Sequence, residues 1–138
     1  MFSTLPSKIL NKYNIRVRCH PASPIASRSN LRKRLEFSDL SLVDLLSWSN
    51  IVMTSSTTSS SLDALCNNKK VLIFVSPGFV NPSPLYPSSL ITWIHGATEL
   101  KHVLESTEFS ISEISKAKDY FFLDSTLPRW SRLLGLDS

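Results

Sequence analysis

The chain has 138 residues, 42% of them hydrophobic and 19% charged, a balance typical of a globular protein that buries a core of its own. No apolar run reaches the roughly 18–20 residues that span a bilayer, and residues 1–14 hold no apolar stretch of signal-peptide length. We therefore expect a cytoplasmic protein without a membrane span.

The formal net charge of +4 is partly concentrated in one short segment. Basic side chains cluster there at Arg28, Arg32, Lys33 and Arg34. Such a cluster fits a nucleic acid, a smaller phosphate-bearing ligand or a solvated basic loop. No aromatic residue interleaves with it and no recognition-helix pattern surrounds it, so we do not expect nucleic acid as the partner.

Hydrophobic patterning predicts helices and strands that alternate along the chain. In chain order, we expect a helix at 7–13, strands at 15–19 and 35–37, a helix at 39–48, a strand at 51–54, a helix at 59–67, strands at 71–75 and 90–94, and helices at 98–104, 111–122 and 127–134. Ser38 or Asp39 is the expected cap of the second helix, and the Asn67–Asn68 pair is expected to end the third.

The order of these elements predicts an α/β fold, a Rossmann-like parallel sheet flanked by helices, in one domain over residues 1–138. The strand at 71–75 is apolar throughout, as in parallel sheets covered on both faces. Ligands of such sheets lie beyond the carboxyl ends of the strands. Three polar segments follow strands here: His20–Pro21, the run after residue 53, and the loop at 76–88 with Asn81, Ser83 and Tyr86. We expect them to form a single site.

The run "TSSTTSSS", residues 54–61, holds eight consecutive hydroxyl side chains between an expected strand and an expected helix. Unpaired N–H groups at a helix N-terminus and small hydroxyl side chains both donate to anions, so residues 56–60 are a candidate phosphate cradle. The alternative is that one hydroxyl caps the helix and the others fill a loop. The three glycines of the chain form no Walker or dinucleotide fingerprint, which disfavours those two classes.

His20 is the expected second contributor, because its imidazole can donate to phosphate from either tautomer. A surface histidine without a ligand is the alternative. We interpret His95 and His102 as structural, and Trp48, Trp93 and Trp130 as packing residues.

Neither cysteine, Cys19 or Cys66, has metal-ligand spacing, so we expect buried free thiols. No DxD pair is present, and no metal or cofactor is expected.

The order of Arg18, His20 and Pro21, then "SLVDLLSWSN", "IVMTSSTTSSSLDAL" and "KKVLIFV", resembles the C-terminal, nucleotide-sugar-binding half of GT-B glycosyltransferases. It is most similar to bacterial transferases that build surface carbohydrates from CMP-activated sialic acid or Kdo, with an HP motif and a Ser-Ser/Thr motif in this order. The resemblance covers roughly residues 5–100. It implies that His20 and Pro21 match the HP motif and that the hydroxyl motif falls among Ser55, Ser56, Thr57, Thr58, Ser59 and Ser60. It also places Asp63 where many GT-B proteins have a ribose-binding Glu.

The sequence departs from this family in three ways. A complete GT-B enzyme has two such domains, and this chain has room for one. The catalytic base lies in an acidic motif of the N-terminal domain, and nothing here matches it. The C-terminal half also usually begins with a strand before its first helix, whereas Met1 lies almost at that helix. We expect the partner domain, with the acceptor site, to come from a second chain or a missing N-terminal domain.

Three functional hypotheses remain. The first is the CMP-sugar-binding domain of a glycosyltransferase for surface polysaccharide or lipooligosaccharide, inactive as this chain alone. The second is half of a GT-B nucleotide-sugar epimerase. The third is a non-catalytic α/β module that binds an anion or nucleic acid.

Overall fold

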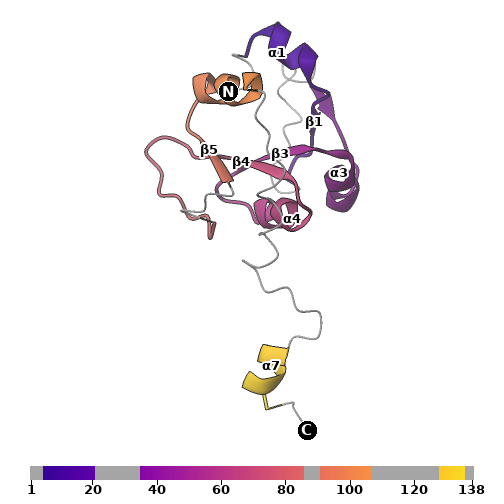
Figure 1. The fold of residues 1–138 in the computed structure, drawn as a ribbon, viewed down its shortest axis with the longest axis vertical. Coiled ribbons are helices and arrows are strands. Elements are labelled where there is room, and N and C mark those ends of the chain that lie inside the picture. Colours follow the sequence, from indigo (N-terminus) through magenta and orange to yellow (C-terminus); the bar gives the residue numbers. More distant parts are fainter. Residues whose placement is uncertain (1–4, 21–34, 86–90, 107–127, 136–138) are drawn as a thin grey trace.

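The structure, a computed structural model, describes residues 5–20, 35–85, 91–106 and 128–135. In chain order the elements are α1 (Ser7–Lys12), β1 (Arg16–Val17), β2 (Glu36–Phe37), α3 (Leu42–Trp48), β3 (Ile51–Ser55), α4 (Ser60–Cys66), β4 (Lys70–Phe74), β5 (Ile91–Ile94), α5 (Ala97–Glu105) and α7 (Pro128–Leu133). Parallel strands flanked by helices form a small α/β, Rossmann-like fold, so the expected fold class is confirmed (Figure 1).

The strands form two parallel sheets. The larger has the order β3-β4-β5, and the smaller pairs β1 with β2. In the larger sheet Ser55 lies opposite Phe74, and Phe74 lies opposite Ile94, so the three strands end level with one another. The connections that follow the three strands therefore all leave the sheet at the same edge.

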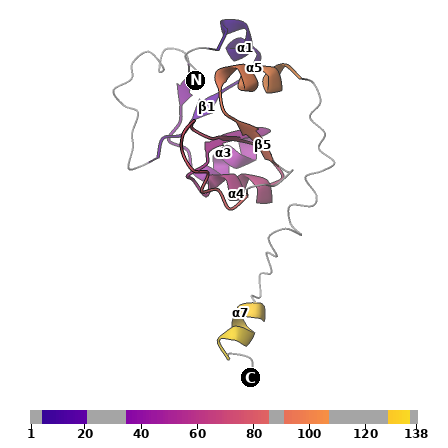
Figure 2. The same cartoon turned by 90° about the vertical axis from the view of Figure 1, so that its left-hand side faces the viewer.

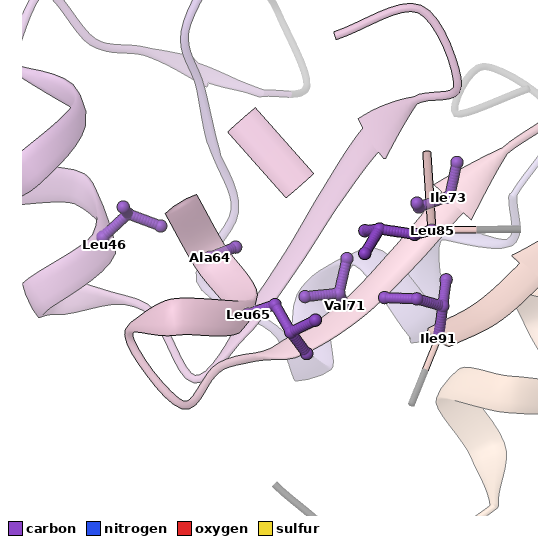
Figure 3. Packing of buried hydrophobic residues seen from close by; sticks show 7 residues of the cluster. All are labelled: Leu46, Ala64, Leu65, Val71, Ile73, Leu85 and Ile91. Carbon is purple, nitrogen blue, oxygen red and sulfur yellow. The ribbon is translucent and has the colours of Figure 1, made fainter. Parts of the chain in front are cut away.

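Helices cover both faces of the three-stranded sheet, because its strands carry apolar side chains on both faces. Helices α1 and α5 lie together on one face, and α3 and α4 lie on the other (Figures 1 and 2). The α3/α4 face is filled by Leu46, Ala64, Leu65, Val71, Ile73, Leu85 and Ile91 (Figure 3). The α1/α5 face is filled by Leu5, Ile9, Leu72, Ile94, Leu100 and Leu104. Alternate residues of β4 therefore enter the two clusters.

The two-stranded sheet is tied to α3 through Arg16. Its Nε lies 3.0 Å from Glu36 Oε1 on β2, and its guanidinium lies 4.4 Å from the ring centre of Trp48. Trp48 is 39% exposed and belongs to neither core cluster; its ring instead contacts the Arg16 cation. Trp93 does pack against the α3/α4 cluster, as expected.

The cap of α3 differs from the sequence-based expectation. Ser41, not Ser38 or Asp39, is the N-cap, and its Oγ accepts from the Asp44 backbone N–H at 3.1 Å. Ser38 Oγ instead accepts from the Leu40 N–H at 3.3 Å, which keeps residues 38–40 in a turn before the helix.

The other expected elements agree with the structure to within a few residues at their ends, apart from two. The strand expected at 15–19 is only two residues long in β1, and the helix expected at 111–122 lies outside the described residues. Asn68, with φ 56°, ends α4 in the left-handed conformation that asparagine tolerates. Helix α7 lies apart from the sheets in both views (Figures 1 and 2). None of the described helices is long and apolar enough to cross a membrane.

Candidate functional site

The candidate site lies at the carboxyl edge of the three-stranded sheet. The connection after β3 begins where the Ser56 N–H donates to Phe74 O at 3.0 Å, and the connection after β4 begins where the Val75 N–H donates to Ile94 O at 2.9 Å. Neighbouring strands lie about 4.8 Å apart, so the first residues of these connections are neighbours in space. The hydroxyl run leaves the sheet at this edge.

Within the run, two pairs of side chains hydrogen-bond each other. Ser55 Oγ and Thr57 Oγ1 lie 2.8 Å apart, and Thr58 Oγ1 and Ser60 Oγ lie 3.1 Å apart. A hydroxyl has one proton to donate, so each pair uses one proton between its oxygens and leaves the other available. We call Ser55 to Ser60 the hydroxyl loop.

One member of the loop also caps α4. Thr58 Oγ1 accepts from the Ser60 N–H at 3.3 Å, whereas Ser59, at the N-cap position, makes no side-chain cap bond. Ser61 is 1% exposed and donates to Thr58 O at 3.2 Å. Part of the run is thus structural, as the alternative interpretation proposed: Thr58 and Ser61 fasten the start of α4. Ser55, Thr57 and Ser59 are exposed.

Asp63 lies one turn into α4 and is exposed. Its backbone oxygen accepts from the Asn67 N–H at 3.1 Å and from Asn67 Nδ2 at 2.8 Å. Burial raises the pKa of the neighbouring Cys66 thiol, and the Asp63 carboxylate adds to that shift. Cys19 and Cys66 are both free thiols, as expected, but they are half-buried rather than buried, because one lies beyond the end of β1 and the other at the end of α4.

His20 is exposed and lies three residues beyond β1, a strand that pairs with β2 and not with the strand that the hydroxyl loop follows. Its expected partner Pro21 and the whole basic cluster (Arg28, Arg32, Lys33 and Arg34) lie outside the described residues.

The connection after β4 is built from short local hydrogen bonds. Asn81 Oδ1 accepts from the Ser83 N–H at 3.1 Å, and Ser83 Oγ accepts from the Leu85 N–H at 3.3 Å. Ser83 is therefore a buried structural hydroxyl rather than a ligand group. Tyr86, also expected at this edge, lies outside the described residues.

Sequence reasoning missed a polar pair at the end of β5. Glu99 Oε2 accepts from the His95 N–H at 2.6 Å and lies 3.3 Å from His95 Nδ1. The backbone hydrogen bond from His95 lowers the pKa of the Glu99 carboxyl. The available signal was the four-residue spacing of His and Glu between an apolar strand and a helix, which is a capping pattern. His95 therefore remains structural, but with a named partner.

Among the described residues, no three His, Cys, Asp or Glu side chains lie together as a metal site would require. Neither a scan against protein-family models nor searches of curated proteins and of solved structures found a match.

Proposed function

We propose that this chain is the nucleotide-sugar-binding domain, with a CMP-linked donor, of a glycosyltransferase that builds surface polysaccharide or lipooligosaccharide. The single observation that supports this proposal best is the hydroxyl loop at the carboxyl edge of a parallel sheet, the edge where ligands of this fold class bind. The CMP-linked donor rests on the motif resemblance alone.

Phosphate binding follows from the chemistry of the loop. Its side chains are all hydroxyls, and the exposed ones, Ser55, Thr57 and Ser59, include no acidic group that would repel an anion. A phosphate oxygen could displace the mutual bonds in the loop and accept both protons of a hydroxyl pair. Hydrogen bonds to a charged acceptor contribute about 1.5–3 kcal/mol each, against about 0.5–1.5 kcal/mol between neutral groups. The exchange therefore favours the anion.

Leaving-group stabilisation is the chemistry that such a loop would supply. As the bond between sugar and phosphate breaks, negative charge grows on the phosphate, and preorganised donors stabilise that charge more than they stabilise the intact donor. The described residues offer no matching base motif, so activation of the acceptor hydroxyl falls to a second chain or an N-terminal domain.

The decisive experiment is a calorimetric and NMR titration of the chain with CMP, UDP and a short oligonucleotide, with sulfate as competitor. We expect millimolar-range CMP binding that sulfate weakens. Preference for UDP would favour half of a nucleotide-sugar epimerase, and preference for the oligonucleotide would favour a non-catalytic module. No heat and no shifts at millimolar CMP would refute the site.

Two substitutions and one control substitution locate the binding on the chain. Ser59→Ala removes an exposed hydroxyl of the loop, and Ser47→Ala removes an exposed hydroxyl on α3 as its matched control. His20→Ala tests the HP motif: the loss of one charge-assisted bond would weaken CMP binding by about 1.5–3 kcal/mol without unfolding the domain. A large drop in melting temperature with unchanged affinity would instead assign His20 to structure.

A further inference from the structure

Two large apolar side chains project from the connection after β4. Phe79 is 77% exposed and Val80 is 90% exposed, the two highest exposures among the large hydrophobic side chains that the structure describes. Burying an apolar side chain of this size stabilises a fold by about 1.5–3 kcal/mol. Two adjacent side chains that forgo this burial form an exposed apolar surface, which we call the apolar tip.

The apolar tip is held by a tight turn. The Phe79 N–H donates to Ser76 O at 3.2 Å, with Pro77 and Gly78 at the two central positions. Gly78 has φ 81°, the value that the third residue of a type II turn requires and that only glycine adopts without strain. A Cβ there would meet no atom within 4 Å, so the constraint is the backbone angle alone. Phe79 is therefore presented by a preorganised turn.

The far end of the connection is anchored in the core. Leu85 is fully buried and lies beside Ile73 of β4 and Ile91 of β5, in the cluster that α4 covers (Figure 3). The connection thus leaves the carboxyl end of β4 and returns along the face of the sheet that α4 covers, which is also the face on which the hydroxyl loop enters α4.

The turn limits how far the apolar tip lies from the strand end that borders the hydroxyl loop. Phe74 O accepts from Ser56 at the start of the loop, and Ser76 follows Phe74 by two residues. The Cα atoms at the two ends of a β-turn lie within about 7 Å of each other, so Phe79 doubles back to Ser76 instead of extending away from the sheet edge.

We propose that Phe79 and Val80 pack against the base of the nucleotide whose phosphate binds the hydroxyl loop. This inference rests on the proposed function and deepens it. A nucleotide has one charged, hydrogen-bonding end and one flat apolar face, and the connections that leave this sheet edge carry both a hydroxyl loop and an exposed aromatic ring. Aromatic side chains stack on every base, so the apolar tip would supply affinity for the nucleoside. Specificity for one base would come from the polar groups around it.

The test compares ligands that share only part of a nucleotide. CMP, cytidine and inorganic phosphate are titrated into the wild-type chain, Phe79→Ala, Phe79→Tyr and the control Val43→Ala, which shortens a 71% exposed side chain on α3. We expect Phe79→Ala to weaken CMP and cytidine binding about 5- to 100-fold and to leave phosphate binding unchanged. Phe79→Tyr keeps the ring and should retain the affinity.

Three outcomes of the ligand titrations would overturn the inference. CMP affinity of Phe79→Ala equal to that of wild type would remove the stacking role and leave the proposed function standing. Equal weakening of CMP and phosphate would assign Phe79 to the shape of the site instead. If the wild-type chain binds neither CMP nor phosphate, both the proposed function and this inference are refuted.

Self-association that disappears in Phe79→Ala, with CMP binding unchanged, would instead identify the apolar tip as a protein contact.

Discussion

At the scale of the single residue, Thr54 has an unfavourable hydrogen-bonding environment. Its Oγ1 is buried and has no hydrogen-bond partner in the described part of the chain, although Thr54 directly precedes the hydroxyl loop. An unsatisfied buried hydroxyl costs about 1–3 kcal/mol. Thr54→Val replaces it with a methyl group of similar size, so we expect the free energy of unfolding to rise by about 1 kcal/mol in urea denaturation.

The control for this variant is Thr57→Val, which changes an exposed hydroxyl that already bonds Ser55. That variant should gain no stability. A loss of stability in Thr54→Val would mean that the Thr54 hydroxyl has a partner in the folded protein.

Also at the residue scale, Glu99 predicts a pH dependence. Its pKa is lowered in the folded chain, chiefly by the hydrogen bond from the His95 backbone N–H. A carboxyl whose folded pKa is lowered stabilises the fold above its ordinary pKa of about 4.3, and that contribution disappears as the pH falls through the lowered value. Melting temperatures of wild type and Glu99→Gln should therefore differ at pH 7 and converge in acid. A difference that stays constant from pH 7 to pH 3 would contradict this assignment.

At the scale of the element, the short helices depend on their ends. Helix α3 has only seven residues, and Ser41 Oγ both accepts from the Asp44 N–H and donates to Asp44 Oδ2 at 2.6 Å. Helices of this length are not stable by themselves. Loss of the cap would therefore also weaken the packing of Leu46 in the core. We expect Ser41→Ala to lower the free energy of unfolding by about 0.5–2 kcal/mol.

Ser47→Ala is the matched control on the same helix. Ser47 is exposed, and within the described residues its hydroxyl bonds back to Val43 O at 3.0 Å, so its removal should be close to neutral. Equal effects of the two substitutions in thermal denaturation would show that the Ser41 cap contributes nothing of its own.

At the scale of the whole molecule, β3 has the side chains of a central strand and the pairing of an edge strand. Ile51 and Met53 pack on the α1/α5 face and Val52 on the α3/α4 face, yet within the described residues β4 is the one strand that pairs with β3. A strand edge that stays unpaired can pair with a further chain. We expect gel filtration to show association with a second chain.

The proposed function predicts that the chain alone has no transferase activity, because the described residues offer no matching base motif. General-base help contributes about 10²–10⁴-fold in rate, and the positioned acceptor contributes further through proximity. A donor-plus-acceptor assay on the purified chain should show no turnover. Turnover by a clean monomer would require a base on this chain, and Asp39, Asp44 and Asp63 would be the first carboxylates to replace.

The sequence by itself determined the elements and their class. Hydrophobic period and turn chemistry depend on neighbouring residues, so they are local signals. Examples are the unbroken apolar run in β4, the alternation of β-branched segments with amphipathic ones, and the asparagine pair after α4. The same local logic identified the hydroxyl run as the polar segment between a strand and a helix.

Only the tertiary structure decided which strands share a sheet and which hydroxyls are available. Pairing and burial depend on residues far apart in the chain, so no local pattern could place β1, the strand before His20, on a different sheet from β3. Nor could it separate buried Ser61, which fastens α4, from exposed Ser59 two residues earlier. Eight similar side chains in a row have the same sequence signal, and they differ physically only in what the fold packs against each of them.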